Sequence, residues 1–216
     1  PEGVLQLVSG NTGKVLWASD GDLDAVVDVP TPDVSAAPAA TVDDADGNTY
    51  TTVQIGNQLW MAENLRTATC SDGTAIPLVD DADDWLTQSS SAYTWGSDVA
   101  GDAQSEQDFG ALYNGFAAAD ACNVCPVDWR MPAAVDFLAL IETLGTDAHL
   151  QLSDPAFWGT DSLATNTSGF SARPAGAQGG DGAGSYDFGA FAYFWSSTPT
   201  AENAQYLMAI NADGAS

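Results

Sequence analysis

The chain has 216 residues, of which 45% are hydrophobic and seven are Trp, so it is long and apolar enough to fold as one domain with a small appendage. Acidic residues outnumber basic residues by 30 to 4, which gives a net charge of −26. Such a surface repels phosphate backbones and anionic headgroups, which excludes nucleic acid and membrane surfaces as partners. No apolar run approaches the roughly 20 residues that span a bilayer, so membrane insertion is not expected.

The excess of acidic over basic side chains indicates adaptation to a hypersaline environment. Repulsion between surface charges is strong in dilute buffer, but the Debye length falls to about 3 Å in molar salt and the repulsion nearly vanishes. An ordinary acidic secreted protein is the alternative, because charge bears on solubility rather than on fold. The chain begins at Pro1 without a Met, which predicts a mature or cut form and is compatible with a removed export signal.

The first 42 residues are predicted to form an arm. Residues 4–8 and 14–18 have the composition of two short strands around a Ser-Gly-Asn-Thr-Gly turn. Residues 29–42 are rich in Pro and Ala, which is typical of an extended linker or of an arm that lies on a neighbouring molecule. We therefore assign residues 1–42 to a strand pair with a linker or docking arm, and residues 43–216 to the main domain.

The main domain begins with a predicted β-hairpin. Residues 50–55 are β-branched and aromatic, with Thr51, Val53 and Ile55 on one face. Gly56 and Asn57 suit a two-residue loop before the second strand at residues 58–61.

Two acidic segments are candidate calcium sites. Residues 44–48 place oxygen ligands two positions apart beside a Gly, but Ile55 stands where a Glu would close an EF-hand loop, which favours a plain turn. Residues 80–84 crowd four carboxylates together, so that either a cation or a solvated loop accounts for them. Calcium is the candidate cofactor, and its candidate ligands are Asp44, Asp46, Asn48, Asp80, Asp81, Asp83 and Asp84.

The clearest predicted helix covers residues 132–144. Its apolar residues recur at helical spacing, Pro132 suits the first turn, and Gly145 is placed to end the helix. After Gly145 the sequence favours loops with short aromatic strands at residues 170–173 and 191–196. One helix beside antiparallel strands predicts an α+β domain.

The segment at residues 46–66 resembles the opening of the Fibrobacter succinogenes major paralogous domain family (FISUMP), found in surface and secreted bacterial proteins. Six further blocks follow in the family's order, at residues 72–77, 82–85, 109–114, 125–132, 164–176 and 192–198. The resemblance implies a C-type-lectin-like, formylglycine-generating-enzyme-like fold, in which a small twisted sheet carries long loops. It also implies an extracellular, cell-surface or virion-surface location.

The chain departs from the family pattern at several positions. Asp128 and Arg130 flank Trp129 where the family usually has Gly and often His. Ala133 stands where Ser or Thr usually caps the helix, with Asp136 three residues later, so a cap worth about 1 kcal/mol is expected to be missing. The family's closing strand, usually Gly-Phe-Ser-Val-Arg-Cys, is absent from the sequence.

The chain contains three cysteines. In the family, the closing Cys would be the natural partner of Cys125, and the joint presence of the other two suggests a disulfide between Cys70 and Cys122. Cys122 and Cys125 could instead form a redox pair or half of a zinc site. Zinc is disfavoured because there is no second Cys pair and His149 is the only histidine. A redox motif is disfavoured because the expected fold is not thioredoxin-like.

Histidine and tryptophan positions are assigned to structure rather than to catalysis. His149 follows the helix on a polar segment without a Ser or Cys partner, which favours a surface residue over a general base. Most Trp residues fall within the family blocks and are assigned to the core, with Trp95 and Trp158 as the expected surface exceptions. No pairing of nucleophile and base is evident, so the chain is not expected to be an enzyme.

A Gly-rich loop at residues 177–189 is the predicted ligand-binding segment. Its glycines do not match a phosphate loop, because no Lys follows them and the region is acidic. A plain spacer is the alternative. The resemblance to lectin-like folds implies that ligands bind on loops in this part of the chain. The candidate contacts are Gln178, Asp181, Tyr186, Asp187 and Phe188.

These observations lead to two functional hypotheses. The first is a non-enzymatic, surface-exposed recognition or adhesion module that binds glycan or protein through its late loops, in a salt-adapted bacterium or a virus that infects it. The alternative is a structural subunit of a fibre, spike or filament, in which residues 1–42 contact neighbouring copies of the chain.

Overall fold

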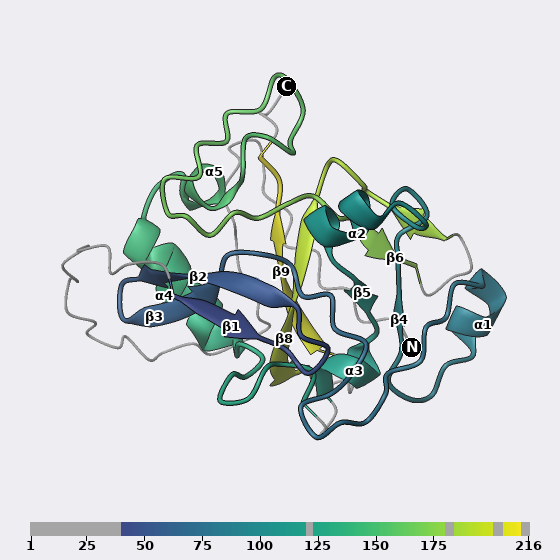
Figure 1. Ribbon diagram of the computed structural model, residues 1–216. Coiled ribbons are helices and arrows are strands. Elements are labelled where there is room, and N and C mark those ends of the chain that lie inside the picture. Colours follow the sequence, from purple (N-terminus) through teal and green to yellow (C-terminus); the bar gives the residue numbers. More distant parts are fainter. Residues whose placement is uncertain (1–39, 120–122, 180–183, 201–204, 213–216) are drawn as a thin grey trace.

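β-branched and aromatic residues form a three-stranded antiparallel sheet. The computed structural model describes residues 40–119, 123–179, 184–200 and 205–212 (Figure 1). β2 (Thr49–Ile55) and β3 (Gln58–Met61) form the predicted hairpin around Gly56, whose φ of 58° suits glycine. β1 (Thr41–Asp43) pairs with the other edge of β2, which gives the order β1-β2-β3. The hairpin prediction is therefore confirmed.

β1 crosses the boundary predicted between residues 42 and 43. It pairs with residues 49–51 of β2, and the Thr52 amide donates a hydrogen bond of 2.8 Å to the Ala40 carbonyl. The sheet thus includes residues that the sequence analysis assigned to the arm. The strand pair predicted at residues 4–8 and 14–18 lies outside the described residues.

Further antiparallel pairs follow the first sheet. β4 (Tyr93–Thr94) pairs with β5 (Leu112–Tyr113), and β6 (Ala177–Gln178) pairs with β7 (Ser185–Tyr186). β8 (Ala192–Pro199) pairs with β9 (Gln205–Ile210) through the middle of the molecule in Figure 1. The predicted α+β class with short antiparallel strands is confirmed.

The predicted helix is confirmed as α4 (Ala134–Leu144). The described residues also contain shorter helices that the sequence analysis did not predict: α1 (Ala82–Leu86), α2 (Ala103–Phe109), α3 (Gly115–Ala119) and α5 (Ala148–Leu152). Asp81 and Asp102 begin α1 and α2, because their carboxylates accept backbone N–H groups of the first turn. None of the described helices has both the length and the apolarity needed to cross a bilayer.

The first N–H groups of α4 donate hydrogen bonds to side chains other than that of the N-cap residue. Ala133 occupies the N-cap and makes no side-chain bond, as expected. The Asp136 carboxylate accepts the Ala133 N–H at 2.7 Å, and Thr198 Oγ1 in β8 accepts the Ala134 N–H at 2.9 Å. Because the first N–H groups of a helix have no partner within it, Thr198 takes part of the role of the missing cap.

The larger core lies where α4 meets the first hairpin and the β8–β9 pair. Its buried members are Ile55, Phe137, Leu140, Leu152, Trp158, Phe170, Ala172, Ala192, Met208, Ile210 and Ala212. Trp158 corrects the prediction of a surface residue: it is 5% exposed, and its Nε1 donates to the Ala172 carbonyl at 3.0 Å. A second cluster is built from Cys70, Ile76, Tyr93, Ala117 and Val124.

The prediction of a strand at residues 170–173 is wrong. This segment makes an isolated bridge between Ser153 and Ala172, and Ser171 has a φ of 59°, which interrupts an extended backbone. The strand predicted at residues 191–196 is confirmed by β8, and its partner β9 was not predicted.

Candidate functional site

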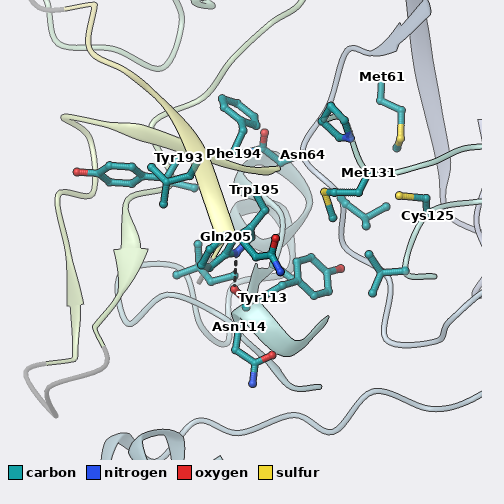
Figure 2. Close-up of a pocket in the computed structure, with 18 of the residues that line it drawn as sticks. Met61, Asn64, Tyr113, Asn114, Cys125, Met131, Tyr193, Phe194, Trp195 and Gln205 are labelled. Atoms are coloured by element: carbon teal, nitrogen blue, oxygen red, sulfur yellow. Dashed lines mark hydrogen bonds between the residues drawn. The ribbon is translucent and has the colours of Figure 1, made fainter. Parts of the chain in front are cut away.

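A cavity of about 1300 Å³ lies between β3, the segment from α2 to α3, the loop before α4, and the β6–β9 region. Figure 2 shows its side chains converging from these segments, which are far apart in the sequence. The lining includes twelve aromatic residues: Trp60, Trp85, Phe109, Tyr113, Phe116, Trp129, Phe137, Phe170, Tyr186, Tyr193, Phe194 and Trp195. Such a cavity can hold a ligand by its apolar faces.

Stacked rings join the cavity to the core. The centroid of the Trp60 ring lies 5.7 Å from that of Phe137 and 5.6 Å from that of Phe170. The Phe170 and Phe194 rings meet edge-on, with their centroids 5.6 Å apart. The Trp60 Nε1 atom is buried and has no hydrogen-bond partner in the part of the chain that the structure describes. These contacts hold this part of the lining in a fixed position.

A hydrogen bond joins Trp195 to the backbone of Tyr113 in the cavity lining. Trp195 Nε1 donates to the Tyr113 carbonyl at 2.8 Å, shown as a dashed line in Figure 2. The Tyr113 hydroxyl donates to the Thr67 carbonyl at 2.7 Å. Burial raises the pKa of Tyr113 well above its ordinary value, so this phenol stays neutral across the physiological range.

The late loop brings two of its predicted contacts to the cavity. Gln178 and Tyr186 line it, and the Tyr186 ring meets the Tyr193 ring edge-on at 6.4 Å. Asp187 and Phe188 are not among the lining residues. Asp187 accepts the Tyr193 hydroxyl at 2.6 Å, and Phe188 packs against Phe109 at 4.7 Å. Asp181 lies outside the described residues.

Glycine at position 176 allows this arrangement. Gly176 has a φ of +67°, and a Cβ there would lie 2.3 Å from the Tyr186 carbonyl oxygen and 2.7 Å from the Phe188 nitrogen. The backbones before β6 and after β7 therefore approach too closely for any side chain at this position.

Several polar atoms of the lining keep unused hydrogen-bonding capacity. Gln58 Nε2 donates to the Asp136 carbonyl, Asn64 Nδ2 donates to the Phe109 carbonyl, and Gln178 Oε1 accepts from Ser185. The other polar atom of each amide has no hydrogen-bond partner among the described residues, and neither does the indole nitrogen of Trp129. The lining thus offers both donors and acceptors.

Charged groups around the cavity are mainly acidic: Glu63, Asp128 and Asp136 against Arg130. Arg130 binds Asp136 through two hydrogen bonds of 2.6 and 2.9 Å. The bonds from Arg130 are the main cause that lowers the pKa of Asp136. Because the cation is already paired, the lining disfavours anionic ligands.

The turn at residues 44–48 is closed by hydrogen bonds within the protein. The Asp44 carboxylate accepts from the Asp46 and Asn48 amides, from Asn48 Nδ2 and from the Tyr50 hydroxyl. The Asp46 carboxylate accepts from Thr67, Ala68 and Thr69. These bonds occupy the carboxylate oxygens of Asp44 and Asp46 and explain the turn without a cation.

The second acidic segment also has structural bonds. Asp80 accepts the Thr94 hydroxyl at 3.0 Å, and Asp81 begins α1 as its N-cap. Asp83 and Asp84 are exposed acids in the first turn of that helix, where negative charge is favourable. Within the described ranges, no three or more His, Cys, Asp or Glu residues group in a way that could hold a metal ion. Calcium binding therefore stays a prediction, and the described residues do not provide a site for it.

Both described cysteines contribute to the second cluster, Cys70 as a buried member and Cys125 packed against it. Cys70 is buried, and the Ser71 N–H beside it donates to the Asn123 carbonyl at 2.9 Å. Cys122 lies outside the described residues, so the Cys70–Cys122 disulfide stays a prediction. Cys125 is a free thiol in the cavity lining, and burial raises its pKa to about 11.

His149 lies on α5 and is not a lining residue of the cavity. Burial is the main influence on its pKa and lowers it, so the imidazole is neutral at pH 7.

Sequence reasoning missed most of the cavity. Trp129 and Trp195 were assigned to the core, yet both are only partly buried and line the cavity. An aromatic residue gives the same sequence signal in a core and in a binding surface, so their positions alone could not separate the two.

Comparison with known proteins identifies one family. The family model of the Fibrobacter succinogenes major domain matches residues 53–214. No curated protein and no solved structure matches the chain.

Proposed function

The chain belongs to the Fibrobacter succinogenes major domain family, and from this premise we propose that it is a non-enzymatic recognition module that binds a neutral glycan in the aromatic cavity. The observation that carries the proposal is the composition of the lining. Aromatic rings offer flat apolar faces for the C–H faces of a sugar, and the amides offer both donors and acceptors for hydroxyl groups.

The late-loop end of the cavity is the proposed contact region. Gln178 in β6 and Tyr186 in β7 line it together with Tyr193 in β8. Tyr186 is 39% exposed, and Gln178 Nε2 donates to no described residue, so both side chains can contact a ligand. The hydrogen bond from the Tyr193 hydroxyl to Asp187 fixes the position of the Tyr193 ring.

Charge supports a neutral ligand. The acidic groups around the cavity and the net charge of −26 repel sulfated or carboxylated glycans. A protein ligand is the second possibility within the same proposal, since an aromatic cavity also receives apolar side chains.

The site supports binding rather than catalysis. Cys125 is the thiol in the lining, and at a pKa of about 11 very little of it is thiolate at neutral pH. His149 lies on another element, away from the cavity lining.

We also propose that the fold is C-type-lectin-like and that the protein is located at a cell or virion surface. Short strand pairs that hold long loops support the first point. Protease treatment of intact cells or particles tests the second: an extracellular domain is cleaved without lysis, whereas protection until lysis contradicts it.

A glycan array probed in molar salt tests the binding proposal. We expect binding to a neutral glycan, with at least a tenfold loss of affinity in Gln178→Ala and in Tyr186→Ala. Gln107→Ala is the control, because Gln107 is exposed and lies outside the cavity lining. A blank array, or variants that bind as well as the parent chain, would overturn the proposal. Binding to a protein alone would overturn the choice of glycan.

A further inference from the structure

The outer edge of β3 has unpaired backbone groups. In a two-residue hairpin the residues that flank the turn, here Ile55 and Gln58, form a hydrogen-bonded pair, and bonded pairs then alternate along the strands. The Ala62 N–H bonds to the Thr51 carbonyl at 2.8 Å, which continues this alternation. The N–H and C=O groups of Leu59 and Met61 therefore face away from β2, and they have no hydrogen-bond partner among the described residues.

Uncharged residues form the surface beside this edge. Residues 57–61 all line the cavity, and the Leu59 side chain is 51% exposed. Natural sheet edges are usually protected by charge, proline or a covering segment, because an open edge pairs readily with another strand. β3 carries no charged residue and no proline. It is therefore suited to receive an extended segment whose side chains enter the cavity.

We propose that the β3 edge binds residues 4–8 of a second copy of this chain. Residues 4–8 read Val-Leu-Gln-Leu-Val, an uncharged segment with strand-forming residues in a chain of net charge −26. The segment itself adds no negative charge to the acidic cavity, and molar salt screens the repulsion between the two copies. In an extended conformation Leu5 and Leu7 lie on one face, so both can enter the cavity while the backbone pairs with Leu59 and Met61.

The sheet order favours a second copy over the chain's own arm. The arm joins the domain at β1, and β1 and β3 are opposite edges of the sheet. To reach β3, the same chain would have to cross the whole sheet, whereas Pro30, Pro32 and Pro38 favour an extended linker. Pairing between copies needs no such crossing.

This inference goes beyond the glycan proposal and uses another part of the cavity. Figure 2 places Met61 at the opposite side of the view from Tyr193. A strand on β3 would therefore leave the Gln178 and Tyr186 side open. The two proposals can fail separately, because the edge variants below do not alter the late-loop contacts.

Sedimentation of the full chain in molar salt, over a concentration series, tests the inference. We expect dimers or larger species that dissociate at least tenfold more readily in Leu59→Lys and in the double variant Leu5→Ser, Leu7→Ser. Leu163→Lys is the control for the edge, since Leu163 is 61% exposed outside the cavity lining. Val26→Ser, Val27→Ser is the control within the arm.

Hydrogen exchange locates the contact in the same samples. The Leu59 and Met61 amides should exchange slowly in the assembled species and rapidly in the two dissociating variants. A monomer at every concentration, or an assembly that Leu59→Lys does not weaken, would overturn the inference. A monomer with protected Leu59 and Met61 amides would assign the pairing to the chain's own arm and also overturn it.

Discussion

Tyr50 holds the start of the domain together through one hydroxyl group. The hydroxyl donates to Asp44 at 2.6 Å and accepts the Arg66 N–H at 3.1 Å, inside a site where the tyrosine is fully buried. Burial raises its pKa far above the ordinary value, with a further contribution from Asp44. The phenol is therefore neutral across the physiological pH range.

Replacement of Tyr50 by Phe should lower the free energy of unfolding by about 2 kcal/mol, because it removes a buried bond to the Asp44 carboxylate and leaves the Arg66 N–H without a partner. Urea unfolding in molar salt measures the loss. Tyr93→Phe is the matched control, since the Tyr93 hydroxyl is not bonded to any described residue. Equal losses in both variants would contradict the role given to the Tyr50 hydroxyl.

Position 176 requires glycine because a Cβ there would clash with neighbouring backbone atoms, and not only because its φ is positive. Gly176→Ala should destabilise the protein by at least about 2 kcal/mol more than Gly73→Ala. Both residues have a positive φ, +67° and +88°, but a Cβ at Gly73 meets no atom within 4 Å. The control therefore isolates the clash with Tyr186 and Phe188. Urea denaturation compares the two variants, and similar losses would show that the close backbone approach is absent in solution.

At the scale of elements, the start of α4 depends on bonds from neighbouring segments. Asp136 accepts the Ala133 N–H and two bonds from Arg130, and its pKa is lowered as a result. A lowered folded-state pKa stabilises the fold above the ordinary Asp pKa of about 3.9, and this contribution is lost as pH falls through the folded-state value.

Asp136→Asn should therefore lower the stability by about 1 kcal/mol at pH 7, a modest value because the Arg130 side chain is 69% exposed. The difference from the parent chain should shrink as the pH is lowered below about 4. Chemical unfolding at a series of pH values gives this difference. Asp161→Asn, at an exposed acid without a bonded partner among the described residues, corrects for the loss of one negative charge. A pH-independent difference would contradict the ion pair.

Elements with strong local signals were predictable from the sequence, and the others were not. The β2–β3 hairpin and α4 follow from strand composition, turn residues and helical periodicity. The helices α1, α2, α3 and α5 have five to seven residues, too few for a periodic pattern. Thr198 supports α4 from a position 64 residues away in the sequence, which no local pattern reveals.

The candidate site was predictable only in its late loop. Gln178 and Tyr186 were named from the Gly-rich segment and the family resemblance, and they do line the cavity. Trp129 and Trp195 reach it from other segments, and their exposure depends on tertiary packing that the sequence does not show. Asp44 and Asp46 were named for calcium because ligand spacing cannot show that protein donors occupy their oxygens.

At the scale of the whole molecule, the net charge of −26 predicts that stability depends on salt. Screening of surface repulsion should raise Tm by roughly 10 °C between 0.1 M and 2 M KCl, which corresponds to about 3 kcal/mol for a chain of this size. Calorimetry over a salt series measures the change. If screening is the cause, NaCl at equal concentration should raise Tm by the same amount as KCl. An unchanged Tm would contradict adaptation to salt.

The rings around the cavity also give the molecule an optical property. Trp60, Trp85, Trp129 and Trp195 line it, whereas Trp158 is buried in the core away from it. Indole emission responds to the polarity of its surroundings, so an occupant that displaces water near these rings should shift the fluorescence of the unlabelled protein. Occupancy can then be followed in molar salt, where methods that depend on charge lose their sensitivity.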